Sequence, residues 1–102
     1  MEIKITEQNG NVLAAVTGRI DALTCEDFQQ QALAALAGAG EKLVLDCAGL
    51  TYISSAGLRS LLVLATCAQR KQTEIVLYRV QYLVREVLEM SGFDSFFTLQ
   101  DK

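Results

Sequence analysis

Apolar and polar residues alternate at the start of the chain, where Ile3 and Ile5 stand among polar neighbours. A period of two is typical of a half-buried β-strand. The turn-forming sequence NGN follows at positions 9–11, and a second apolar run extends from Val12 to Val16. This pattern predicts an N-terminal β-hairpin.

Three later segments place apolar residues three to four positions apart, the spacing of an amphipathic helix. The first covers residues 25–37 and is followed by Gly38 and Gly40, and the third ends before Gly92. Glycine commonly follows the last turn of a helix. The apolar positions of the three helices are Phe28, Ala32, Leu33 and Leu36; Leu58, Leu61, Leu62 and Ala65; and Leu83, Val84, Val87 and Leu88.

Between the helices lie two short, continuous apolar runs, KLVLDC at 42–47 and TEIVLY at 73–78. Such runs are typical of strands that helices cover on both faces. A final run, FFTL at 96–99, predicts a short edge strand. The order predicts an α/β domain with a mixed β-sheet and right-handed crossovers. Functional sites in such sheets lie at the carboxyl ends of the strands, and the loops at 18–24 and 46–57 follow such ends here.

The composition agrees with one globular domain that spans residues 1–102. Of the 102 residues, 51% are hydrophobic and none is proline. The first residues do not resemble a signal peptide, and no apolar stretch approaches the roughly 20 residues that span a bilayer. A net charge of -3 without a cluster of lysine and arginine argues against nucleic acid as a partner. We therefore expect a soluble, cytoplasmic protein.

Cysteine and histidine usage bears on metal and redox chemistry. The three cysteines, Cys25, Cys47 and Cys67, are widely spaced and form no CxxC pair, and the chain contains no histidine. This usage disfavours both a disulfide framework and a zinc site. We expect structural thiols, no metal site and no cofactor.

Without histidine, Ser54 and Ser55 lack the usual general base of a catalytic serine. Asp21 and Asp46 could form a carboxylate pair for acid–base chemistry, but aspartates in loops more often cap turns or helices. A small enzyme that uses Asp21 or Asp46 is the alternative that this pair leaves open.

The stretch from Ser54 to Gly57 stands where the second helix should begin. Ser54 or Ser55 can cap that helix. Gly57 in its first turn weakens the helix by up to about 1 kcal/mol relative to alanine, and it permits another protein to approach closely. A helix N-terminus favours an anion, so a serine here is well suited to carry a phosphate.

Three stretches, TGRIDALT, LVLDCAGLTYISSAGLRSLL and LVREVLEMSGFDSFF, in this order and spacing resemble a STAS domain of the bacterial anti-sigma factor antagonist type. The resemblance covers nearly the whole chain, and the middle motif is the most specific. It implies a partner-switching protein that binds an anti-sigma factor and so frees the sigma factor. The anti-sigma factor is also a serine kinase of the histidine-kinase-like ATPase fold. Phosphorylation by the kinase releases the antagonist, and a metal-dependent phosphatase restores it.

In this family the motif is Asp-Ser-Ser or Asp-Ser-Thr followed by glycine, and its first hydroxyl residue accepts the phosphate. Aligned on Gly57, the implied acceptor is Ser55, while Ser54 replaces the aspartate and becomes a possible competing acceptor. The resemblance implies that Asp21 and Asp46 border the binding surface; a role for both as turn caps stays open. The implied partner-binding residues are Asp21, Asp46, Ser54, Ser55, Ala56, Gly57, Leu58 and Arg59.

Val63 and Leu64 widen the apolar stripe of the second helix beyond one packing face, which predicts a docking face unless neighbouring helices cover them. We expect a monomeric regulatory module that has no catalytic activity and no membrane partner. The alternative within the family is a STAS interaction module of a scaffold complex or a lipid-transport assembly, without phosphorylation.

Overall fold

The computed structural model describes residues 1–101, apart from the side chain of Gln8. The chain opens with the predicted hairpin, in which strands β1 (Glu2–Gln8) and β2 (Asn11–Ile20) pair antiparallel. Asn9 and Gly10 connect them with φ values of 53° and 81°. These are the left-handed conformations that a two-residue hairpin turn requires.

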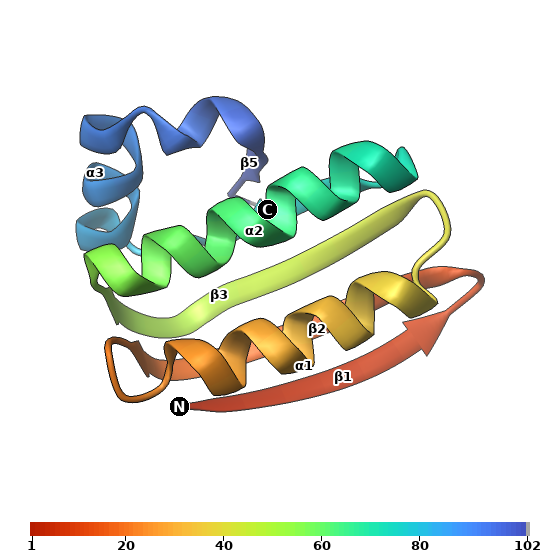
Figure 1. Ribbon diagram of the computed structural model, residues 1–102, viewed down its shortest axis with the longest axis horizontal. Helices are drawn as coiled ribbons and strands as arrows, with labels where there is room; N and C mark the ends of the chain where they lie inside the picture. Colours follow the sequence, from red (N-terminus) through yellow and green to blue (C-terminus); the bar gives the residue numbers. More distant parts are fainter. Residues whose placement is uncertain (102) are drawn as a thin grey trace.

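The remaining elements alternate between helix and strand, which confirms the predicted α/β fold (Figure 1). They are α1 (Cys25–Gly38), β3 (Lys42–Ile53), α2 (Ser55–Lys71), β4 (Glu74–Tyr78), α3 (Tyr82–Ser91), the 3-10 helix η1 (Phe93–Phe96) and β5 (Thr98–Gln100). None of the helices in residues 1–101 has the length and apolarity needed to cross a membrane.

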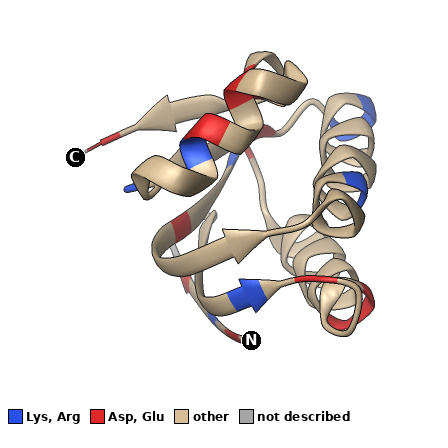
Figure 2. Ribbon diagram, turned by 90° about the vertical axis from the view of Figure 1, so that its left-hand side faces the viewer, with Lys and Arg blue, Asp and Glu red and all other residues tan. Residues whose placement is uncertain are grey.

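The sheet has the order β1-β2-β3-β4-β5, and all pairs from β2 to β5 are parallel. Each helical connection from β2 onward leads to the next strand on the same side of the sheet order. Right-handed crossovers of this kind place their helices on the same face of the sheet. Figure 2 shows α1 and α2 together on one side of the strands. Along the first half of β3, buried and half-buried residues alternate. The prediction that helices cover both faces of the run at 42–47 is therefore wrong.

Strand β3 is longer than the sequence pattern predicts. Its pairing with β2 shifts register between Ala15 and Thr17 and again between Gly18 and Arg19, where β3 has the extra residues. Such bulges break the period of two, and they allow Cys47, Leu50 and Ile53 all to be buried in the core. Most of the predicted loop at 46–57 is consequently strand, and a single residue separates β3 from α2.

The core lies between the sheet and the helices, and the helix faces differ from the prediction at two leucines. In α3, Val84 and Leu88 are buried, whereas Leu83 is 66% exposed. A ten-residue helix that packs with one face turns the residue preceding Val84 toward solvent. In α2, Leu64 is only 1% exposed and belongs to the core. Leu64 is therefore no part of a docking face, while its neighbour Val63 is 38% exposed.

Candidate functional site

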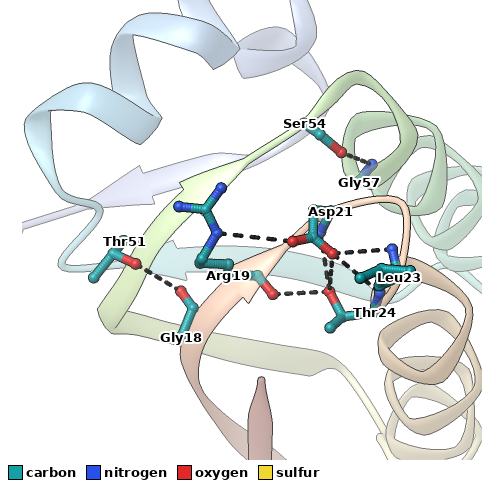
Figure 3. Close-up of polar contacts among 8 residues, drawn as sticks. All are labelled: Gly18, Arg19, Asp21, Leu23, Thr24, Thr51, Ser54 and Gly57. Carbon is teal, nitrogen blue, oxygen red and sulfur yellow. Dashed lines mark hydrogen bonds and ion pairs between the residues drawn. The ribbon is translucent and has the colours of Figure 1, made fainter.

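Two segments meet at the carboxyl ends of β2 and β3: the turn at residues 21–24, here called the Asp21 turn, and the start of α2 (Figure 3). The strands finish in register, with Ile20 beside Ile53. One residue later, the backbone N–H of Ser54 donates to the carbonyl oxygen of Ile20 at 2.9 Å. The Asp21 turn and the start of α2 are therefore adjacent, whereas the rest of the predicted loop at 46–57 belongs to β3.

Gly57 makes this close approach possible. A Cβ at this position would lie 2.7 Å from Cγ1 of Ile53 and 2.9 Å from the carbonyl oxygen of Ile20. Gly57 is buried, and because it has no side chain, β2 and β3 of the same chain can pack directly against its backbone. The expectation that this glycine gives another protein access is wrong.

The two serines have different environments. Ser54 is the N-cap of α2, and its Oγ accepts a hydrogen bond from the N–H of Gly57 at 3.2 Å. Ser55 is the first residue of the helix and is exposed, and its hydroxyl makes no hydrogen bond within residues 1–101. Capping thus belongs to Ser54.

The Asp21 turn is held by its own side chains (Figure 3). Oδ1 of Asp21 accepts hydrogen bonds from the N–H groups of Leu23 at 3.0 Å and Thr24 at 3.2 Å. The Thr24 hydroxyl accepts from the N–H of Asp21 at 2.9 Å and donates to the carbonyl oxygen of Arg19 at 2.8 Å. The hydrogen bond from Leu23, with those from Thr24 and the charge of Arg19, lowers the pKa of Asp21 despite the opposing effect of burial. Asp21 therefore has the turn-capping role.

Arg19 flanks the turn on the side of β3. Its Nε lies 3.7 Å from Oδ2 of Asp21, and its guanidinium carbon lies 4.3 Å from the centre of the Tyr52 ring. The cation–π contact and the ion pair together keep this arginine at the end of β2. A positive charge therefore stands beside the Asp21 carboxylate.

The Asp21 turn also carries a residue that the sequence analysis did not single out. Leu23 lies between Asp21 and Thr24, and it is 93% exposed. The available signal was a large aliphatic residue between the small and polar residues of a predicted loop. Its exposure depends on the direction of the turn, which the pattern does not reveal.

Asp46 lies away from this surface. It is in the middle of β3 rather than at its end. Its partner on β2 is Ala15, which precedes Ile20 by five residues, roughly 17 Å along that strand. Oδ2 of Asp46 lies 2.7 Å from Nη2 of Arg79, and Oδ1 accepts from the N–H of Ala48 at 3.1 Å. Burial by itself raises the pKa of Asp46, but the hydrogen bonds from Arg79 and Ala48 and the charge of Arg79 outweigh it, and the pKa is lowered. Asp21 and Asp46 thus do not form a carboxylate pair.

The first turn of α2 contributes the other predicted site residues. Ala56 and Leu58 are half-buried, and Leu58 packs against the core. Arg59 is exposed, and it makes no ion pair with another residue of the part of the chain that the structure describes. Arg59 stands one helical turn after Ser55, a spacing at which side chains are neighbours on a helix surface.

Cysteines and carboxylates make no metal centre within residues 1–101, where no group of three potential ligands gathers. Cys47 is buried, and its thiol lies 3.4 Å from the carbonyl oxygen of Leu45. Burial, followed by the negative charge of Asp46, raises the pKa of Cys47 to about 12. This cysteine packs in the core as a neutral thiol.

Sequence comparison finds a family match over almost the whole chain. The model of the family described as "Mlab, STAS domain" matches residues 4–100. BtrV of Bordetella bronchiseptica, a protein named as an anti-sigma factor antagonist, is 39% identical to this chain over 98 residues. The match covers 95% of this chain and 84% of BtrV.

Solved structures with the same fold include an anti-sigma factor antagonist from Mycobacterium paratuberculosis, with a TM-score of 0.86, 20% identity and coverage of 99% of this chain and 86% of that one. SpoIIAA in its unphosphorylated form matches with a TM-score of 0.80 at 14% identity, covering 99% of this chain and 90% of SpoIIAA. The phosphorylated form of the Bacillus protein matches with a TM-score of 0.73 at 16% identity, covering 99% and 93%. At these identities the likeness shows the fold.

Proposed function

The chain belongs to the STAS domain family, and we propose that it acts as an anti-sigma factor antagonist whose binding is controlled by phosphorylation of Ser55. Unphosphorylated, it binds an anti-sigma factor that is also a serine kinase of the histidine-kinase-like ATPase fold. Phosphorylation releases it, and a metal-dependent phosphatase restores the binding form. The observation that carries this proposal is the hydroxyl of Ser55 at the start of α2, which is exposed and makes no hydrogen bond with the part of the chain that the structure describes.

The geometry favours Ser55 over Ser54 as the acceptor. The hydroxyl of Ser54 is engaged with the N–H of Gly57 at 3.2 Å, and its side chain is half-buried. A kinase that modified Ser54 would have to break this cap, whereas the Ser55 hydroxyl is already accessible. In the transfer step, Oγ of Ser55 forms a bond to the γ-phosphorus of ATP as the bond to ADP breaks. The hydroxyl proton passes to a base on the kinase.

The start of α2 can hold the product without refolding. The unpaired N–H groups of the first helical turn and the helix dipole favour a negative charge at this position. Arg59, exposed and one turn along, can pair with part of the phosphate. An exposed pair of this kind contributes only about 0 to 1 kcal/mol, too little to rearrange the domain.

Release follows from charge at the interface. Phosphorylation adds about -1.5 to -2 charges to Ser55, while ADP, which is also negative, remains on the kinase at the point of transfer. The Asp21 carboxylate stands beside the same surface. Like charges brought together at an interface cost several kcal/mol, which weakens binding.

The partner surface in this proposal consists of the Asp21 turn and the first helical turn, residues 54–59. Asp46 lies in the middle of β3, opposite Ala15 of β2 and away from the end of the strand, so we leave it out of the contact. The alternative is a STAS interaction module of a scaffold complex or a lipid-transport assembly, in which Ser55 stays unmodified.

Phosphorylation with purified kinase tests the proposal. The serine kinases of the histidine-kinase-like ATPase fold from the source organism are each incubated with ATP and this protein, and the intact mass is measured. One added phosphate, located at Ser55 by peptide mapping and absent from Ser55→Ala, is the expected result. Labelling that persists in Ser55→Ala and disappears in Ser54→Ala would move the acceptor to Ser54. Absence of labelling by every kinase, with an unmodified protein in the native cell, would favour the alternative.

A further inference from the structure

Leu23 is the most exposed of the large apolar side chains that the structure describes, at 93%. The next are Met90 at 83% and Tyr82 at 73%, both on α3. Leu23 instead stands in a short turn between β2 and α1. A single exposed leucine is unremarkable on a protein surface, so its surroundings decide what it signifies.

The turn that carries Leu23 is held by several hydrogen bonds. The N–H of Leu23 donates to Oδ1 of Asp21 at 3.0 Å, and the hydroxyl of Thr24 bridges the N–H of Asp21 and the carbonyl oxygen of Arg19. The N–H of Cys25 also donates to the carbonyl oxygen of Asp21 at 2.8 Å. Asp21, Leu23 and Thr24 thus all make hydrogen bonds within the turn, and the remaining residue, Ala22, lies between two of them. A side chain displayed on such a preorganised segment loses little backbone entropy when a partner binds it.

Both ends of this turn are tied to the element that carries Ser55. At the first end, the N–H of Ser54 donates to the carbonyl oxygen of Ile20 at 2.9 Å. At the other end, the hydroxyl of Ser60, a buried residue of α2, donates to the carbonyl oxygen of Cys25 at 3.1 Å. The Asp21 turn, which carries Leu23, is therefore joined by hydrogen bonds at both of its ends to the first two turns of α2, which carry Ser55.

We propose that Leu23 is the apolar anchor of the kinase contact, inserting into an apolar pocket that lies beside the active site of the kinase. This inference rests on the proposed function, because it names the residue through which the kinase that modifies Ser55 recognises the chain. At 93% exposure, Leu23 has almost its whole apolar surface to gain from burial. A few buried side chains carry most of the binding energy of an interface, and a hydrogen-bonded turn lowers the entropic cost of burying one. In α2 itself, Val63 has far less apolar surface available for burial by a partner, since it is 38% exposed.

Binding and phosphorylation kinetics with purified kinase test this assignment. The serine kinases of the histidine-kinase-like ATPase fold from the source organism are first tested for binding to the wild-type protein. A kinase that binds is then used to test the variants. We expect Leu23→Ala to weaken its binding by at least about tenfold, while Leu23→Met, which keeps an aliphatic surface, stays within about threefold. In phosphorylation assays Leu23→Ala should raise KM and leave kcat unchanged, because the Ser55 hydroxyl is untouched.

Leu13→Ala provides the matched control. Leu13 is also an exposed leucine, at 40%, but it lies near the other end of β2, and its truncation should leave binding unchanged. The melting temperature of Leu23→Ala should stay within roughly 3 °C of wild type, because an exposed side chain contributes little to folding.

The outcomes separate the two proposals. If the wild-type protein binds a kinase and Leu23→Ala binds it within about twofold, the anchor is refuted while the partner-switching function stands. If Leu23→Ala lowers kcat and leaves KM unchanged, Leu23 acts on the transfer step and the anchor is likewise refuted. If the wild-type protein binds and is phosphorylated by none of the kinases, the proposed function falls and the anchor with it.

Discussion

The backbone of Gly57 lies directly against Ile20, so closely that a Cβ on Gly57 would stand 2.9 Å from the carbonyl oxygen of Ile20. Real Cβ atoms are essentially never found within 3.0 Å of a neighbouring atom. The contact seats the first turn of α2 on the end of β2, and the N–H of Ser54 completes it by donating to the same carbonyl oxygen at 2.9 Å. The relation between Ser55 and the Asp21 turn depends on this contact.

Gly57→Ala should therefore destabilise the protein. Helix propensity favours alanine by up to about 1 kcal/mol, but forcing a methyl group against the backbone of β2 costs about 1–3 kcal/mol in a packed core. We expect a net loss in the free energy of unfolding, measured in urea. Gly38→Ala is the control, because a Cβ there meets nothing within 4 Å, and it should be neutral or mildly stabilising. Equal effects of the two substitutions would contradict the packing role of Gly57.

The two serines should differ in their contribution to stability. Ser54→Ala removes the cap on the N–H of Gly57 and should cost about 1 kcal/mol, within the range 0.5–2 known for N-caps. Ser55→Ala removes an exposed hydroxyl that bonds to none of the described residues, and it should change stability by less than about 0.5 kcal/mol. Urea unfolding of both variants measures the difference. A larger loss in Ser55→Ala would mean that Ser55 performs the capping in solution.

Ser55→Asp should weaken kinase binding by at least about tenfold, near 1.4 kcal/mol, because even one added negative charge opposes the bound nucleotide. Amide chemical shifts should change mainly within residues 19–25 and 52–60, which surround the substituted position. Ser55→Asn, similar in size but neutral, is the matched control and should bind more tightly than Ser55→Asp. Loss of binding with shifts spread through the whole sheet would contradict a local switch and indicate a repacking of α2.

Asp46 should make stability depend on pH at the acidic end. Its folded-state pKa lies below the ordinary value of 3.8, owing to Arg79 and the N–H of Ala48 acting against burial. A depressed carboxyl pKa adds stability that is present above the unfolded-state pKa and is lost as the pH falls through the folded-state pKa. Thermal unfolding of wild type and Asp46→Asn should thus differ above about pH 4 and converge below it. In an Arg79→Gln background the pH-dependent difference should shrink, and an unchanged difference would exclude Arg79 as a cause.

Thiol labelling should distinguish Cys47 from the other two cysteines. With a pKa of about 12 and 4% exposure, Cys47 has neither the thiolate nor the access that alkylation requires. Iodoacetamide at pH 8 followed by peptide mapping should modify Cys25 and Cys67, which are half-buried, and leave Cys47 intact until urea is added. Modification of Cys47 at the same rate in the folded protein would show that the centre of β3 opens readily.

Local chemistry made much of the architecture predictable. The alternation at Ile3 and Ile5 with an Asn-Gly turn indicates a hairpin, because both the period of two and the left-handed turn are short-range properties. Helical spacing likewise located the three helices. The start of α2 was predictable for the same reason, since capping serines and a following apolar stripe are features of a few consecutive residues.

The position of Asp46 and the serine that caps α2 were not predictable in this way. The apolar run stops at Cys47, so the pattern ends the strand there, while two bulges against β2 continue it to Ile53. Those bulges exist only in the pairing of two distant segments. The choice of Ser54 as the cap likewise depends on how Gly57 packs against Ile20.

The sequence by itself determined the order of the elements, the helix that begins beside the two serines, and the glycine that marks Ser55 as the candidate acceptor. Tertiary structure alone decided which surfaces are exposed. It buried Leu64 at 1% exposure and left Leu23 at 93%, although both are leucines in segments that carry the predicted site. The physical reason is that burial depends on the elements that pack against a side chain, and crossovers of a single hand brought those elements to one face of the sheet.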